Sequence, residues 1–198
     1  MSQMQPRVPP LTDLDALSPQ QNKLRQRLGR RGEDPKNIFR TLLRFPDFMA
    51  AMMPLAAHCA DAGGLTPRLR ELVILRSAWR CDCEYEWAQH AETALAAGLS
   101  AAQIEAVAAG AFAAEWLPQE RLVLRAVDEL HEADCICDAT WAALDAFYGE
   151  ATIVDLIATC GFYHMLAWQL RSLGVPIEPG RPGFSPTLRR LREDLGRA

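Results

Sequence analysis

A series of helix start signals constrains this fold most, each a capping residue or a proline ahead of an apolar segment. Asp34-Pro35 and Thr66-Pro67 place a capping side chain before proline at the first helical position. Ser100 and Gln103 have the spacing of a capping box, and Pro118 opens a further segment. Ala, Leu and straight-chain charged residues outnumber Val, Ile, Tyr and Phe, which favours helix over strand. The sequence therefore predicts an all-α fold.

The last long segment, residues 151–173, is apolar nearly all round. A helix of that composition is normally surrounded by protein, so we expect it to be the central buried helix. The other predicted helices lie between the start signals and the next glycine or proline, at 34–45, 48–59, 66–79, 83–97, 100 onward, 118–133 and 138–147.

The chain has 198 residues, enough for one domain with a real core. Residues 1–33 mix Pro, Gln, Arg and Gly with an apolar patch at Leu11, Leu14 and Leu17. We expect this N-terminal arm to be partly disordered or docked on a partner subunit. Residues 34–176 are the predicted helical domain, and residues 177–198 a tail ending in a short basic helix.

The net charge of −4 gives no general attraction for a nucleic-acid backbone, so we expect no nucleic-acid partner. No run of 18 apolar residues is present, and the first twenty residues lack the apolar core of a signal peptide. We therefore expect a cytoplasmic protein with no membrane partner. Its six cysteines are then expected to be reduced thiols.

Three chemically active side chains share one face of the segment at 83–97. Because each helical residue advances by about 100°, Cys83, Glu86 and His90 fall within roughly 60° of one another. Their neighbours on that face are small or aromatic, which is unusual company for a solvated carboxylate and imidazole. Glu71 lies on the preceding helix, which the short connection at 80–82 folds back against this one.

A thiol, an imidazole and two carboxyl groups in one semi-buried pocket can act as a proton relay, with a carboxylate orienting the ring. Each residue alone is more often structural, because single histidines and buried cysteines commonly serve packing. Three polar groups on one inward face are harder to explain by packing. We therefore treat Glu71, Cys83, Glu86 and His90 as the candidate catalytic set.

The runs Arg70-Glu-Leu-Val-Ile-Leu-Arg76 and Cys83-Glu-Tyr-Glu-Trp-Ala-Gln-His90, followed by Ala97-Gly-Leu-Ser100, resemble the carboxymuconolactone decarboxylase and alkylhydroperoxidase D (AhpD-like) superfamily. The resemblance covers about residues 34–176. It implies a bundle of about seven to eight helices and a homo-oligomer, a trimer or hexamer or possibly a dimer.

The peroxidase branch of that superfamily uses Glu, then Cys-x-x-Cys, then His. By resemblance Glu71, Cys83 and His90 match that pattern, but the second cysteine position is Glu86. A dithiol peroxidase needs the partner thiol for recycling. The decarboxylase branch has a Glu/His pair that Glu86 and His90 match. Weaker pocket candidates are Tyr85, Trp87 and His164.

Two Cys-x-Cys pairs fall outside the main motif. Cys81 is a possible redox partner for Cys83, although so short a ring is strained and easily reduced. Cys135 and Cys137 raise the alternative of zinc bound by four thiolates, but this spacing is a poor match to usual zinc ligands. We expect no metal and no cofactor.

Three hypotheses for function follow. The leading one is a lyase- or isomerase-type enzyme that performs acid–base chemistry on a small organic acid or lactone, with His90 as the central base or acid. The second is a thiol peroxidase working through Cys83, alone or with Cys81. The third is a non-catalytic helical oligomer whose pocket binds a ligand or whose arm binds a partner.

Overall fold

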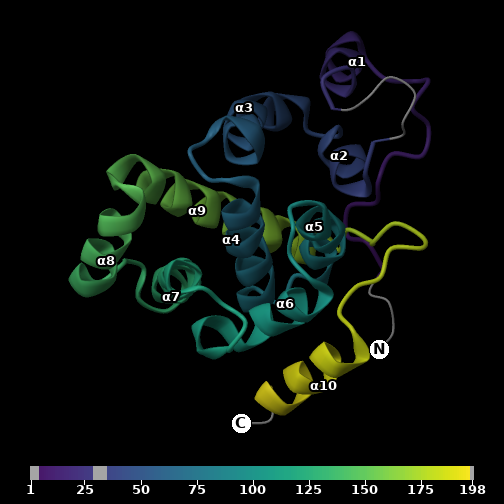
Figure 1. The fold of residues 1–198 in the computed structure, drawn as a ribbon. Helices are drawn as coiled ribbons and strands as arrows, with labels where there is room; N and C mark the ends of the chain where they lie inside the picture. Colours follow the sequence, from purple (N-terminus) through teal and green to yellow (C-terminus); the bar gives the residue numbers. More distant parts are fainter. Residues whose placement is uncertain (1–4, 29–34, 197–198) are drawn as a thin grey trace.

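The computed structural model describes residues 5–28 and 35–196 (Figure 1). Within these ranges it is all-helical, as predicted, with ten α-helices rather than seven to eight. The helices are α1 (Pro19–Arg25), α2 (Asn37–Leu42), α3 (Pro46–Ala57), α4 (Pro67–Arg80), α5 (Glu84–Ala96), α6 (Ala101–Ala106), α7 (Pro118–Ala133), α8 (Asp138–Tyr148), α9 (Glu150–Leu173) and α10 (Pro186–Leu195).

The capping signals mark several helix ends as predicted. Thr66 accepts a hydrogen bond from the Leu69 amide at the start of α4, and Ser100 and Gln103 form the reciprocal capping box of α6. The helix predicted at 34–45 is shorter, because α2 begins at Asn37 without a side-chain cap. The proposed capping residue Asp34 lies outside the described residues.

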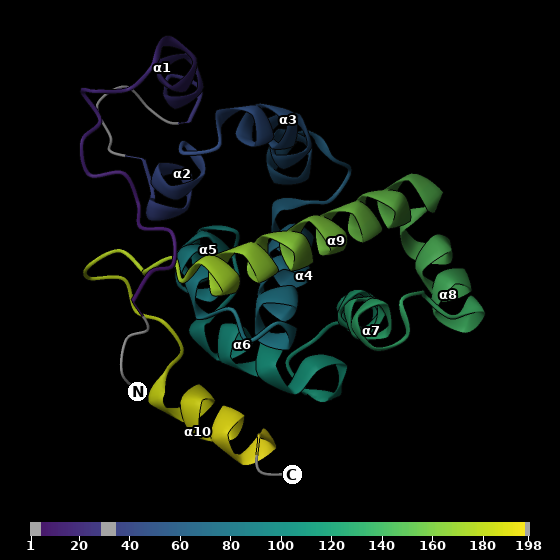
Figure 2. The same cartoon turned by 180° about the vertical axis from the view of Figure 1, so that it is seen from behind.

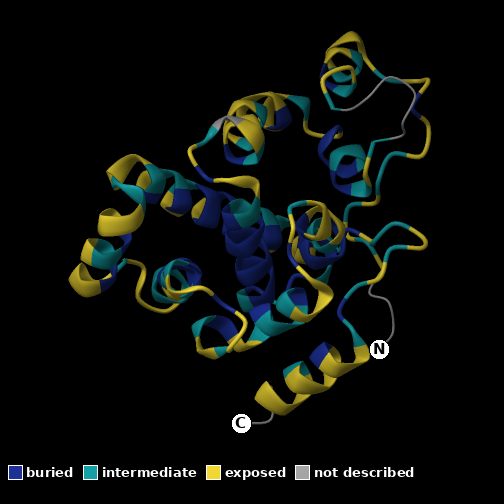
Figure 3. Cartoon of the chain, viewed as in Figure 1, coloured by how far each residue is buried: buried dark blue, intermediate teal, exposed yellow. Residues whose placement is uncertain are grey.

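The central helix is α4, not α9 as the sequence predicted. α4 packs against α5, α7 and α9, and its residues from Glu71 to Trp79 are all buried (Figure 3). α9 crosses α4, lying behind it in Figure 1 and in front of it in Figure 2. It leaves part of its apolar surface exposed, including Val154 and Trp168. The distribution of apolar residues around α9 therefore did not identify the innermost helix. α9 is also long and apolar enough to cross a membrane, but here it packs within the bundle.

A buried arginine joins α4 to the helices beside it. Arg76 forms two hydrogen bonds to Asp128 of α7, at 2.7 and 3.0 Å, and donates to the Val107 and Ala108 carbonyl oxygens at 2.8 Å. Gly110 lies against the guanidinium with a φ of +65°, where a Cβ would stand 2.6 Å from an Arg76 nitrogen. These contacts satisfy the buried charge, as burial requires.

The described part of the N-terminal arm packs on the body of its own chain. The Arg7 amide donates to the Leu173 carbonyl at 2.8 Å, and the Leu11 amide donates to that of Arg40 at 3.2 Å. Leu11, Leu17 and Leu24 join the apolar cluster around α2, α3 and α9. The arm's leucines therefore make apolar contacts within their own chain.

Candidate functional site

The α4–α5 hairpin brings Glu71 and His90 into contact. A tight turn at Cys81–Cys83, with Asp82 at a φ of +53°, reverses the chain between the two helices. His90 Nδ1 then lies 2.8 Å from Glu71 Oε2. The Glu71 side chain is 1% exposed and that of His90 20% exposed, so the pair reaches from the core to a cavity wall.

This contact fixes which ring nitrogen is free. A carboxylate only accepts hydrogen bonds, so Nδ1 of His90 carries the proton and Nε2 keeps its lone pair in the neutral ring. Within the described residues Nε2 has no hydrogen-bond partner. The other Glu71 oxygen is 3.4 Å from Arg70 Nε, so the buried carboxylate has a counter-ion. His90 is thus an oriented base.

Glu86 is a buried carboxyl without partners. It is 2% exposed, and neither carboxyl oxygen has a hydrogen bond to any described residue. Burial raises the pKa of Glu86 well above its ordinary value of 4.5, because the charged form has lost its water. The group therefore keeps its proton at a pH where an exposed glutamate has lost it, which suits a general acid.

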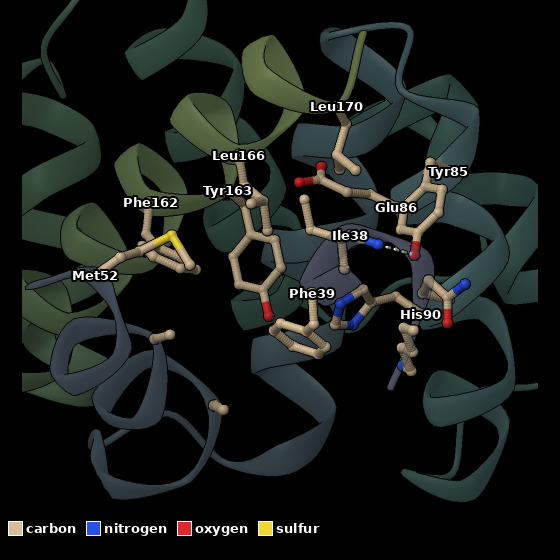
Figure 4. Close-up of a pocket in the computed structure, with 14 residues that line it drawn as sticks. Ile38, Phe39, Met52, Tyr85, Glu86, His90, Phe162, Tyr163, Leu166 and Leu170 are labelled. Atoms are coloured by element: carbon tan, nitrogen blue, oxygen red, sulfur yellow. Dashed lines mark hydrogen bonds between the residues drawn. The ribbon is translucent and has the colours of Figure 1, made fainter. Parts of the chain in front are cut away.

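Glu86 and His90 line the same apolar cavity, of about 220 Å³, between α5, α2, α3 and α9 (Figure 4). The volume is below the about 300 to 1,000 Å³ of common ligand pockets, so it suits a small molecule. The lining residues are Lys36, Ile38, Phe39, Met52, Ala56, Ala60, Tyr85, Glu86, Gln89, His90, Phe162, Tyr163, Leu166 and Leu170.

The C-terminal tail supports one wall of this cavity. Glu178 Oε1 accepts a hydrogen bond from the Tyr85 hydroxyl at 2.7 Å, and Oε2 accepts one from the Gln89 side chain. The Tyr85 oxygen accepts in turn from the Ile38 amide at 3.1 Å. Tyr85 thereby ties α5 to α2 and to the tail, and it lines the cavity as the sequence suggested.

Sequence reasoning missed Tyr163, which lies beside His90. Their rings meet edge to face with centroids 5.1 Å apart. The available signal was the spacing of Phe162, Tyr163, Leu166 and Leu170, which places one apolar face of α9 toward the cavity. Lys36 and Gln89 were also missed, since neither belongs to a recognisable motif.

The two cysteines beside the motif are placed differently from its acid and base. Cys83 caps α5 and lines a separate pocket near Gln5 and Val175, not the His90 cavity. Burial raises the pKa of the Cys83 thiol, and it raises the pKa of the Cys81 thiol to about 12. Both are therefore protonated at neutral pH, whereas nucleophilic thiols need depressed pKa values.

Two weaker candidates do not line the cavity. Trp87 packs in the core against Trp79 and Phe184, with ring centroids 6.2 and 5.3 Å away. His164 projects from the other face of α9, where its Nε2 is 3.0 Å from His131 Nδ1. The helix rotation of about 100° per residue separates His164 from the adjacent Tyr163.

The four cysteines of the two Cys-x-Cys pairs do not form a ligand cluster within residues 5–28 and 35–196. Cys135 and Cys137 are exposed at the α7–α8 connection, whereas Cys81 and Cys83 are buried at the α4–α5 turn. The zinc alternative based on four thiolates is therefore not supported by this arrangement.

Comparison with known proteins gives one family model that matches the segment carrying the motif. The model of the carboxymuconolactone decarboxylase family matches residues 46–129, which contain Glu71, Cys83, Glu86 and His90. Among curated proteins, no sequence matches this chain.

Solved structures with the same fold cover from 67 to 87% of the chain. The AhpD-core, peroxidase-related protein from Ralstonia eutropha JMP134 aligns with a TM-score of 0.76 at 20% identity, covering 87% of this chain and 93% of that one. The apo debrominase Bmp8 aligns at 0.69 and 17%, covering 87% and 92%. A putative antioxidant defence protein AhpD from Agrobacterium tumefaciens aligns at 0.60 and 20%, covering 67% and 92%. Together with the family match, these confirm the predicted resemblance and fold class.

Proposed function

We propose that this chain, which carries the carboxymuconolactone decarboxylase segment on an AhpD-like fold, is an acid–base enzyme of the lyase or isomerase type. Its substrate is a small organic acid or lactone. One observation carries the proposal: His90, oriented by Glu71, and the protonated Glu86 line one small apolar cavity. A proton donor and a proton acceptor that face one cavity are what such chemistry requires.

In this mechanism His90 Nε2 removes a proton from a substrate carbon next to a carbonyl group. The imidazolium that forms is stabilised by Glu71, which already accepts the Nδ1 hydrogen bond. The Glu86 carboxyl donates its proton to the carbonyl oxygen where negative charge develops. In an isomerisation His90 then returns its proton to another carbon of the enol, and the enol hydroxyl returns its proton to the Glu86 carboxylate as the carbonyl re-forms, so both residues regain their starting states.

The cavity opening supports an acidic substrate. Lys36 lies at the edge of the cavity and is exposed, so its ammonium can pair with a substrate carboxylate while the rest of the molecule enters the apolar interior. Gln89 Oε1 is buried and has no partner among the described residues, which leaves an acceptor for a substrate hydroxyl.

A second candidate is thiol chemistry at Cys83. It is favoured by the fold of the peroxidase-related neighbours and of the debrominase Bmp8, a cysteine-to-alanine variant of which was solved with 2,3,4-tribromopyrrole. That complex aligns with a TM-score of 0.66 at 17% identity, covering 95% of this chain and 96% of that one. The raised pKa of Cys83 and its position outside the His90 cavity argue against it here. A sulfenate or disulfide in the intact mass after mild peroxide would support it, and unmodified Cys83 would eliminate it.

The acid–base proposal is tested with a panel of small lactones and keto acids. We expect His90→Gln and Glu86→Gln each to lower kcat by about 10²- to 10⁴-fold, the usual contribution of one general acid or base. His58→Ala, which changes an exposed histidine outside the cavity, is the control and should keep full activity. Full turnover by both cavity variants would exclude this mechanism and favour a ligand-binding role.

We also propose that the chain is a homo-oligomer in the cytoplasm. Several large apolar side chains are exposed on the single chain, with Phe112 the most exposed at 95%. Such groups often mark contacts between subunits. Light scattering that gives a monomer at micromolar concentration would contradict the oligomer.

A further inference from the structure

A second polar cluster lies on the face of α9 that points away from the His90 cavity. Cys81, His131 and His164 come from the end of α4, from α7 and from α9, and one potential ligand atom from each lies within 4.8 Å of the others. None of these residues lines the His90 cavity. The acid–base mechanism therefore leaves this cluster unexplained.

The His164 ring is already held in place through Nδ1, the nitrogen that faces away from His131. His164 Nδ1 lies 2.9 Å from the Cys160 carbonyl oxygen, which only accepts, so Nδ1 carries the proton. The lone pair of Nε2 then points toward His131 Nδ1, 3.0 Å away. Histidines that bind metals usually donate their other ring N–H to a carbonyl or carboxylate, which fixes the ring as it is fixed here.

We propose that Cys81, His131 and His164 bind one divalent transition-metal ion of the zinc class. The donors are a thiolate and two imidazoles, which suit zinc and not magnesium or calcium, because those ions prefer oxygen ligands. Zinc bonds of about 2.0 to 2.3 Å in a tetrahedron place ligand atoms roughly 3.3 to 3.7 Å apart. The present spacing, from 3.0 Å to at most 4.8 Å, reaches that range by side-chain rotation.

The charges around the cluster tolerate a cation. Arg80 is paired with Glu132 at 2.6 Å and lies 3.7 Å from Asp128. Arg171, which donates to the Cys81 carbonyl oxygen at 2.7 Å, is paired with Asp82 at 3.0 Å. On binding, Cys81 releases its thiol proton to solvent and contributes one negative charge. His131 moves its proton from Nδ1 to Nε2, and Nδ1 then becomes a ligand atom.

Three protein ligands leave the fourth tetrahedral position open. His131 and His164 border a pocket of about 290 Å³ whose wall includes Cys160, Gly161 and Trp168. An open position beside a pocket is the arrangement of zinc sites that bind water or a small anionic ligand. This site is independent of the acid–base proposal, because the two pockets share no lining residue.

The test uses the full-length chain, purified with a non-chelating phosphine reductant and stripped of metal. We expect equilibrium dialysis against Zn²⁺ to give one ion per chain. We expect Co²⁺ to give the visible absorption of a tetrahedral site and a thiolate-to-cobalt charge-transfer band. His131→Ala, at a half-buried position, should lower Zn²⁺ affinity by more than about 100-fold, the upper end of second-shell effects.

The control is the double variant Cys135→Ser/Cys137→Ser, which removes the two exposed thiols and should retain one ion. If His131→Ala does not fold, as judged by circular dichroism, Cys81→Ser provides the same test and should abolish the charge-transfer band. Absence of stoichiometric binding, or equal binding by wild type and the folded ligand variant, would overturn the proposal. Binding lost only in the double variant would also overturn it.

Discussion

The two faces of α9 carry different chemistry from neighbouring positions in one helix. Tyr163 lies against His90 and lines the same cavity as Glu86, whereas the next residue, His164, lies against His131 and near Cys81. On the Tyr163 face an acid and a base surround an apolar cavity. On the His164 face two imidazoles border a second pocket, and the Cys81 thiol lies within 4.8 Å of both. The difference teaches that sequence proximity on a helix says little about shared function, because each residue turns by about 100°.

The largest expected effect separates the two faces by activity. Glu71→Gln should lower kcat by about 10²- to 10⁴-fold, since an amide can no longer stabilise the His90 imidazolium. His131→Ala changes a residue of α7 that lies against the opposite face of α9. It should change kcat less than about twofold, because substitutions at sites that share no contacts usually have independent effects. Steady-state kinetics of both variants makes the comparison. Equal losses would mean that the two faces work as one site.

The next effect separates the faces by stability. Tyr163→Ala removes a buried ring that contacts both His90 and Phe162, so the free energy of unfolding should fall by about 3 to 5 kcal/mol. Trp168→Ala changes a side chain that is 62% exposed on the other face and should cost less than about 1 kcal/mol. Urea denaturation measures both. A large loss for Trp168→Ala would show that another subunit covers the outer face.

A third effect concerns the buried carboxyl. Glu86 binds a proton more tightly in the folded chain than in the unfolded chain, so stability should fall as pH rises above 4.5 toward the folded pKa. The slope approaches about 1.4 kcal/mol per pH unit for one proton. Glu86→Leu should abolish this slope and raise stability near pH 7 by about 1 to 3 kcal/mol, since an unpartnered polar group is removed.

The matched control for that slope is Phe112→Ala, which changes an exposed, non-titrating side chain and leaves Glu86 and its cavity unchanged. Urea denaturation between pH 4.5 and 8 should give wild type and this control the same Glu86-dependent slope. If Glu86→Leu keeps the slope as well, the carboxyl is ionised in the folded chain, and its role as a general acid fails.

Much of the fold could be predicted because a few adjacent residues determine where a helix begins or ends. Thr66-Pro67, the Ser100 and Gln103 capping box, and Pro118 each set a helix start from a few adjacent residues. Which helix lies at the centre depends on packing between distant segments. α4 was missed as the central helix because Arg76 gives it a polar appearance, and the partner that neutralises Arg76 comes from α7.

The candidate site likewise contains some features that adjacent residues predict and others that depend on distant segments of the chain. Glu71 could be expected near the helix of His90, because a tight turn joins the two helices, but the turn did not determine which carboxyl group would contact the ring. Glu178 could not be foreseen, since it reaches Tyr85 from a loop 93 residues further along the chain. Hydrophobicity alone did not show which side of α9 faces the cavity, because apolar residues surround that helix, and only the spacing of Phe162, Tyr163, Leu166 and Leu170 marked it.

The smallest effect tests a carboxyl group of α9 whose pKa is shifted in the opposite direction to that of Glu86. Asp155 accepts hydrogen bonds from the Gly64 amide at 2.5 Å and from His58 Nε2 at 2.7 Å, and these partners hold its pKa below the ordinary value of 3.8. Its contribution is therefore present above pH 3.8 and is lost as pH falls through the lower folded value. Asp155→Asn should cost about 1 kcal/mol near pH 7 and progressively less in acid. Urea denaturation across this range should give a slope opposite in sign to that of Glu86, because Asp155 is hydrogen-bonded in the folded chain and Glu86 is not. A matching sign would mean that hydrogen bonding does not set the proton affinity of either carboxyl.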